Sequence, residues 1–157
     1  NPRYISRRLL RFASEDVGLA DPQALVQAIA SWETYERLGS PEGELAIAQC
    51  VIYLAVAPKS NATYLALNSS MQTARDNGSF HPPKHILNSP TALMNDLGYG
   101  DGYEYDHDSK ISFSGQNYFP EGLDRQKFYK PKESGFERDV IKRLEYWNKL
   151  RQNKGHK

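Results

Sequence analysis

The segment from residue 45 to residue 57 constrains the fold more than any other part of this sequence. It is the most apolar stretch of the chain, with Ser40-Pro41 shortly before it and Pro58 directly after it. On a helix its apolar side chains fall on nearly every side: Leu45, Ile47, Val51, Ile52, Leu54 and Val56. We therefore expect a central helix that neighbouring elements cover on most sides. The stretch is shorter than the ~20 residues that a membrane span needs, so we expect no membrane partner.

Helix signals recur on both sides of this segment. Further helices are predicted to begin at Pro2, Asp21-Pro22, Ser60 and Ser89-Pro90, where a capping side chain or a proline suits the first turn. Glycines that can adopt the left-handed conformation are expected to end helices at Gly18, Gly39, Gly78 and Gly98. Ser134 and Glu137 have capping-box spacing before a last amphipathic helix. The pattern predicts an all-α fold.

Residues 98–131 differ from the rest of the chain in composition and in hydrophobic periodicity. They hold five of the 11 glycines and eight of the 18 aromatic residues, and helical periodicity disappears. We expect a long irregular segment here, with a short β-hairpin around residues 111–113 and 127–129 as an open alternative. A loop of this length is unusual in a compact domain unless it has a function.

The sequence contains no recognisable catalytic constellation. It lacks a phosphate-binding GxxxxGK[ST] loop and a GxSxG nucleophile elbow. The acids between Asp101 and Asp108 lack the order of a calcium loop, and surface charge is the favoured reading. Cys50 is expected to be buried in the apolar helix, and a reducing cytoplasm fits its isolation. We expect no catalytic, cofactor or metal residues in this chain, and no enzymatic activity of its own.

Net charge is only +1, but arginines crowd the first predicted helix. Arginine suits phosphate, and the candidates for contact with DNA phosphates are Arg3, Arg7, Arg8, Arg11 and Lys59. Two other interpretations stay open: pairing within the chain with Glu15, Asp16 or Asp21, and ion pairs between subunits.

Aromatic residues and arginine are typical of the centres of protein interfaces. The candidates for an oligomer interface are Trp32, Tyr35, Tyr103, Tyr105, Tyr118, Phe119, Arg7 and Arg8. The rings of the 98–131 segment could also stack on single-stranded bases, but the four acids among the first of them argue against DNA there.

Several long strings resemble the replication-associated recombination protein A (RarA/MgsA) family of AAA+ ATPases, akin to the eukaryotic Werner-helicase-interacting ATPase. They are RRLL at 7–10, ASEDVGLADP at 13–22, GE at 43–44, APKSNA at 57–62, NSPT at 88–91, LM at 93–94, LGYG at 97–100, YEYDHD at 103–108, YFP at 118–120 and FYKP at 128–131. The resemblance covers the chain from about Arg3 to Arg151, and the tail after it matches nothing that we can place.

The resemblance implies a clamp-loader-collar-like helical domain that assembles into a homotetramer. It implies that an AAA+ motor with its lid, which would bind ATP and Mg, precedes this region. The absence of an initiator methionine also suggests a fragment of a longer protein. Implied partners are single-strand-binding protein and DNA at replication forks, in the cytoplasm at the nucleoid. We accordingly expect one oligomerisation domain over residues 1–151 and a frayed polar tail over 152–157.

Overall fold

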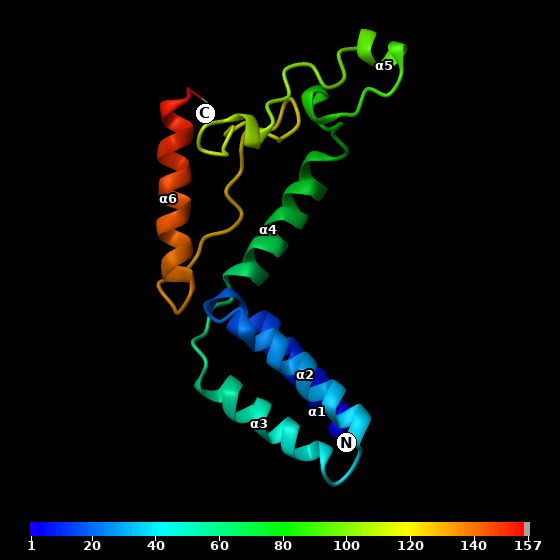
Figure 1. Cartoon of the computed structure of the whole chain (residues 1–157), viewed down its shortest axis with the longest axis vertical. Coiled ribbons are helices and arrows are strands. Elements are labelled where there is room, and N and C mark those ends of the chain that lie inside the picture. The colour runs from blue at the N-terminus through cyan, green and yellow to red at the C-terminus, as the bar shows by residue number, and fades with distance from the viewer. Residues whose placement is uncertain (156–157) are drawn as a thin grey trace. The chain divides into compact units, whose positions relative to one another are not determined.

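The computed structural model describes residues 1–155 and is all-helical over them, as expected. Its α-helices are α1 (Pro2–Phe12), α2 (Gln23–Leu38), α3 (Gly43–Val56), α4 (Ala62–Asn77), α5 (Ala92–Asp96) and α6 (Glu137–Asn153) (Figure 1). A π-helical turn follows α1 at Ala13–Val17, and short 3-10 turns lie at Gly18–Ala20, Lys84–Ile86 and Asp106–Asp108. The described residues contain no strand, so the hairpin left open at 111–113 and 127–129 does not form.

The chain divides into two compact units, and two of the three boundaries between them fall inside helices, namely α4 and α6. The first unit comprises Asn1–Met71 and Phe128–Lys142. The second comprises Gln72–Lys127 and the part of α6 from Arg143 onward. The expectation of one domain over residues 1–151 stays a prediction.

Local chemistry explains where α1 and α2 begin. The Asn1 side chain accepts hydrogen bonds from the backbone N–H groups of Arg3 and Tyr4, at 3.0 and 3.4 Å. The Asp21 carboxylate accepts from the backbone N–H of Gln23 at 3.0 Å. These contacts satisfy amides that the first helical turn leaves without a carbonyl partner.

Helix α3 begins at Gly43, two residues after Pro41, and this first residue lies directly against α2. A Cβ atom on Gly43 would stand only 2.8 Å from the Tyr35 Cα atom. Glycine therefore permits the close approach, and α2 and α3 pack side by side with α1 in the first unit (Figure 1). At the other end Ala57 is extended, as the residue before Pro58 must usually be.

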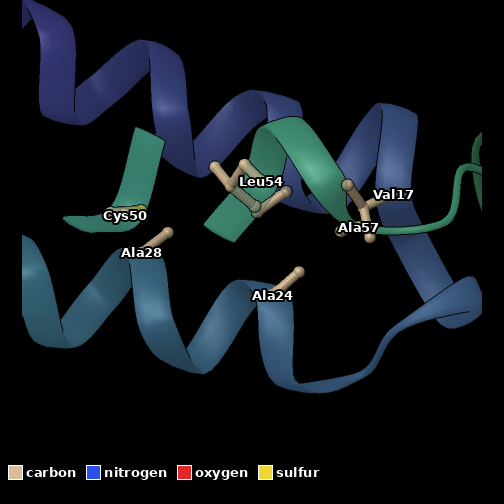
Figure 2. Close-up of a cluster of buried hydrophobic side chains, with 7 residues drawn as sticks. Val17, Ala24, Ala28, Cys50, Leu54 and Ala57 are labelled. Atoms are coloured by element: carbon tan, nitrogen blue, oxygen red, sulfur yellow. The ribbon is translucent and has the colours of Figure 1, made fainter. Parts of the chain in front are cut away.

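The core of the first unit is built from small side chains. It comprises Ala13 and Val17 from the π-helical turn, Ala24 and Ala28 from α2, Cys50 and Leu54 from α3, and Ala57 directly after α3 (Figure 2). Small residues allow helix backbones to approach closely. Cys50 is buried, as expected, and this burial raises the pKa of its thiol.

The carboxylate of Glu137 connects residues 129–132 to Ser60 within the first unit. Its carboxylate is fully buried and accepts hydrogen bonds from the Ser60 hydroxyl (2.7 Å), the Tyr129 hydroxyl (2.8 Å) and the Lys132 backbone N–H (2.7 Å). The capping box expected between Ser134 and Glu137 is therefore wrong, since the carboxylate turns inward to these three donors. Burial, together with the Glu137 carboxylate, raises the pKa of Tyr129.

In the second unit, side-chain hydrogen bonds hold the irregular segment together. Gln116 donates to the Gly102 carbonyl at 2.7 Å and accepts from the Glu104 backbone N–H at 3.0 Å. The Lys154 ammonium donates to the Phe113 carbonyl at 2.6 Å. Helix α6 thus extends beyond Arg151 into the region expected to fray, while residues 156 and 157 of that tail lie outside the described residues.

Candidate interface

Helix α3 presents two apolar faces, and only one of them is buried by the chain. Ile47, Cys50 and Leu54 point into the core. The other side, which we call the outer α3 face, consists of Leu45, Ile52 and Val56. These side chains are 75%, 66% and 80% exposed.

The expectation that neighbours would cover this helix on most sides is therefore wrong within a single chain. Residues 45–58 contain no charged side chain, so the exposed half of the helix lacks the charges that normally face water. The spacing of Leu45, Ile52 and Val56 by seven and then four residues places them along one stripe. An apolar stripe left in water on a well-packed helix is typical of a surface that binds another protein.

Helix α2 also carries exposed apolar side chains. Leu25, Val26 and Ile29 lie on its surface, outside the core that Ala24 and Ala28 enter. Exposed apolar side chains thus lie on two helices of the first unit that pack against each other.

Two of the aromatic candidates contact their own chain. The Trp32 indole N–H donates to the Glu36 carboxylate at 3.2 Å, and the ring is partly buried. Tyr35 is partly buried beside Gly43. Their place in an oligomer interface stays a prediction.

The remaining aromatic candidates belong to the second unit. Tyr103, Tyr105 and Tyr118 are each about half exposed, while Phe119 is partly buried. They too stay predictions as interface residues. Sequence reasoning did not predict the outer α3 face. An apolar helix has the same residue pattern whether its second face packs against its own chain or against another one.

The arginines of α1 divide into two pairs. Arg3 makes a two-point hydrogen bond to Glu36, at 2.9 and 3.0 Å, and Arg11 pairs with Glu15 at 2.6 Å. These hydrogen bonds lower the pKa of both carboxyl groups. Pairing within the chain, one of the interpretations left open above, is confirmed for Arg11 with Glu15. Arg3 also pairs within the chain, but with Glu36, which was not among the acids that we expected.

Arg7 and Arg8 are exposed and form no hydrogen bond or ion pair with any residue in 1–155. Lys59 is engaged: its ammonium donates to the Leu54 carbonyl at 2.7 Å and to the Ala57 carbonyl, and lies 5.4 Å from the centre of the Phe12 ring. Of the five candidates for phosphate contact, Arg7 and Arg8 are thus the two that form no hydrogen bond or ion pair over this range, although the charge of Arg8 helps to lower the pKa of Glu15.

Residues 1–155 contain neither a metal-binding cluster nor a membrane-spanning helix. No group of three His, Cys, Asp or Glu side chains is placed to hold a metal ion. None of the helices in this range combines the length and apolar character needed to cross a membrane.

Comparison with known proteins places these features in a family. The family model described as "MgsA AAA+ ATPase C terminal" matches residues 1–148. The replication-associated recombination protein A of Coxiella burnetii is 48% identical to this chain, over all of this chain and 36% of its own length. Its namesake from Escherichia coli K12 is 43% identical over 98% of this chain and 34% of its own length. The ATPase WRNIP1 of Dictyostelium discoideum is 41% identical over 83% of this chain and 15% of its own length.

The chain thus spans about a third of the length of the bacterial relatives named here. The match over nearly all of the chain confirms the family resemblance found in its sequence strings. An all-helical chain that matches this model from its first residue to residue 148 belongs to the MgsA AAA+ ATPase C-terminal family.

Proposed function

We propose that this chain is the C-terminal oligomerisation module of a DNA-dependent AAA+ ATPase that acts in replication-fork maintenance, recombination and repair. The observation that carries the proposal is the outer α3 face, an uncharged apolar stripe that its own chain leaves in water. The names of the bacterial relatives, which are replication-associated recombination proteins, support the setting.

A second copy of the chain is the occupant that fits this face best. Burying a Leu, Ile or Val side chain contributes about 1.5–3 kcal/mol, and about two thirds or more of that remains available at each of the three positions. In a two-fold contact the same stripe is buried on both copies, so each residue counts twice. The exposed side chains of α2 add area toward the ~1,200 Å² of a stable interface.

Assembly would give the domain a mechanical task. We expect a homotetramer in which these modules form a collar that holds several ATPase motors at fixed spacing. ATP and Mg would bind in the motor part of the parent protein, and this chain would contribute no catalytic residue. The parent would work on DNA at replication forks in the cytoplasm, in contact with single-strand-binding protein.

Light scattering on the purified chain tests the proposal. The expected molar mass at micromolar concentration is four times the 17.9 kDa of one chain. A monodisperse monomer at every concentration up to about 100 μM would exclude self-association as the function of the domain.

DNA binding through α1 is a second candidate, because Arg7 and Arg8 are exposed and form no hydrogen bond or ion pair within residues 1–155. With only two such charges the affinity for DNA should be weak, and each phosphate contact should add a little under one unit to the slope of log affinity against log salt. The double variant Arg7→Ala/Arg8→Ala should then lose nearly two units of slope. Submicromolar binding that is insensitive to salt would contradict this weak electrostatic mode.

A further inference from the structure

A glutamine interrupts the apolar stripe of the outer α3 face. Gln49 lies four residues after Leu45 and three residues before Ile52, so helical geometry places its side chain in the same stripe. It is the single amide side chain in the sequence of α3, and it is exposed. A stripe whose other members are apolar thus contains one neutral polar group near its middle.

The Gln49 amide has no hydrogen-bond partner among residues 1–155 of its own chain. It borders a cavity of about 200 Å³ between α2 and α3, together with Ser31 and Thr34. The hydroxyls of Ser31 and Thr34 donate to carbonyls within α2, at 3.1 and 2.8 Å, so neither is left to donate to Gln49. In the single chain the amide is therefore left to hydrogen-bond with water.

Burial of the outer α3 face removes this water. A buried polar group without a hydrogen-bond partner costs free energy, and a glutamine amide has two N–H donors and a carbonyl acceptor to satisfy. Leu45, Ile52 and Val56 carry no polar side-chain atom. The partner of the amide must therefore come from the second copy, and the amide that the same stripe of that copy presents is its own Gln49.

The position of a two-fold axis decides whether the two amides meet, because only residues at the axis lie against their own counterparts. With the axis beside Gln49, each amide donates an N–H to the carbonyl oxygen of the other. With the axis between Gln49 and Ile52, an antiparallel pair of helices places Gln49 against Ile52 and buries both amides without partners. The amide therefore favours one register over its neighbours, as a single polar residue does in a coiled-coil seam.

The lack of charge on α3 fits contact with an identical surface. A charged side chain at a two-fold axis meets a like charge, whereas a neutral amide meets a matching donor and acceptor. Residues 45–58 contain no charged side chain, so no register along them brings like charges of these residues together. The amide of Gln49 is then the polar group that distinguishes one register from another.

We propose that Gln49 sets the register of the contact between two copies of this chain by pairing with Gln49 of the second copy. The pairing rests on the proposed oligomerisation, and it adds the position of the two-fold axis, which lies beside Gln49. The occupant of the outer α3 face is then a second copy in one defined register.

A charge exchange at position 49 tests the pairing. Gln49→Glu and Gln49→Lys should each associate at least about tenfold more weakly than the wild-type chain in sedimentation velocity, because two like charges meet at the axis. An equimolar mixture of the two variants should associate at least about tenfold more tightly than either variant alone, because opposite charges then meet. Circular dichroism melting checks that both variants are folded, as expected for changes at an exposed helix position.

Gln152, an exposed glutamine of α6 in the second unit, is the matched control. Gln152→Glu and Gln152→Lys should associate as the wild-type chain does, both alone and mixed. Two results would overturn the pairing: association of the Gln49 variants as tight as that of the wild-type chain, and a mixture that gains nothing over the separate variants. A monomeric wild-type chain would refute the oligomerisation together with the pairing, so the two failures are distinguishable.

Discussion

Replacing Ile52 by glutamate probes the outer α3 face without disturbing the core. The side chain is 66% exposed in the single chain, so the fold should tolerate the change, and glutamate is a good helix former. The free energy of unfolding of the monomer should therefore change by less than about 1 kcal/mol. Self-association should weaken strongly, because the site that tolerates a charge in the monomer becomes buried in the oligomer.

The size of the effect follows from the exposed fraction. Two thirds of the roughly 2 kcal/mol gained by burying an isoleucine is about 1.3 kcal/mol per copy, and a two-fold contact loses it twice. The unpaired carboxylates add a further desolvation cost. A lower bound of about 2 kcal/mol corresponds to a dissociation constant raised at least 30-fold.

Sedimentation velocity over a range of micromolar concentrations measures this change, and circular dichroism melting checks the fold. Leu67→Glu is the matched control, since Leu67 is an apolar side chain of α4 with 59% exposure, and it should keep the wild-type association. Ile52→Leu should keep the wild-type association. The reasoning is refuted if Ile52→Glu is folded and associates as tightly as the wild-type chain.

Four further outcomes are expected. Gly135→Ala should lower the free energy of unfolding by at least about 2 kcal/mol in urea denaturation, because its Cβ would lie 2.1 Å from the Ala20 carbonyl oxygen at a φ of +50°. Gly39→Ala is the control: it has a φ of +69° with open space around it, and it should lower the free energy of unfolding by about 1 kcal/mol. Equal losses in the two variants would contradict the steric argument. Tyr129→Phe should cost roughly 1–2 kcal/mol at neutral pH, because Glu137 loses one of its three donors. The raised pKa of Tyr129 means that the folded chain holds the Tyr129 hydroxyl proton more tightly than the unfolded chain does. The contribution of Tyr129 to the free energy of unfolding should therefore be complete below its unfolded pKa of about 10 and should fall as pH rises above that value. If the wild-type chain and Tyr129→Phe show the same dependence of stability on pH, the raised pKa of Tyr129 is contradicted. Calorimetry should detect no saturable binding of ATP to this chain, and tight binding would refute its assignment as a non-catalytic module.

Helix positions were predictable because their signals are local. Asp21, Gly39 and Pro58 act on the backbone within a few residues, and the helices end or begin close to them. The burial of Cys50 also followed from its neighbours in sequence. The family could be identified from strings that extend over nearly all of the chain.

Features that depend on distant residues could not be predicted in the same way. Glu137 has capping-box spacing to Ser134, but the donors that it meets include Ser60, which is 77 positions away. The exposed state of Ile52 depends on how many neighbours cover α3, and the composition of the helix contains no such information. The pairing of Arg3 with Glu36 likewise follows from the packing of α1 beside α2.

The contact between copies can be observed directly in a mixed sample in which one half of the chains carries labelled methyl groups and the other half is unlabelled. Isotope-filtered nuclear Overhauser spectra then report only the contacts that join two copies. We expect such contacts from the methyl groups of Leu45, Ile52 and Val56, the outer α3 face. A stable oligomer whose intermolecular contacts all arise elsewhere, with none at Ile52, would contradict the account.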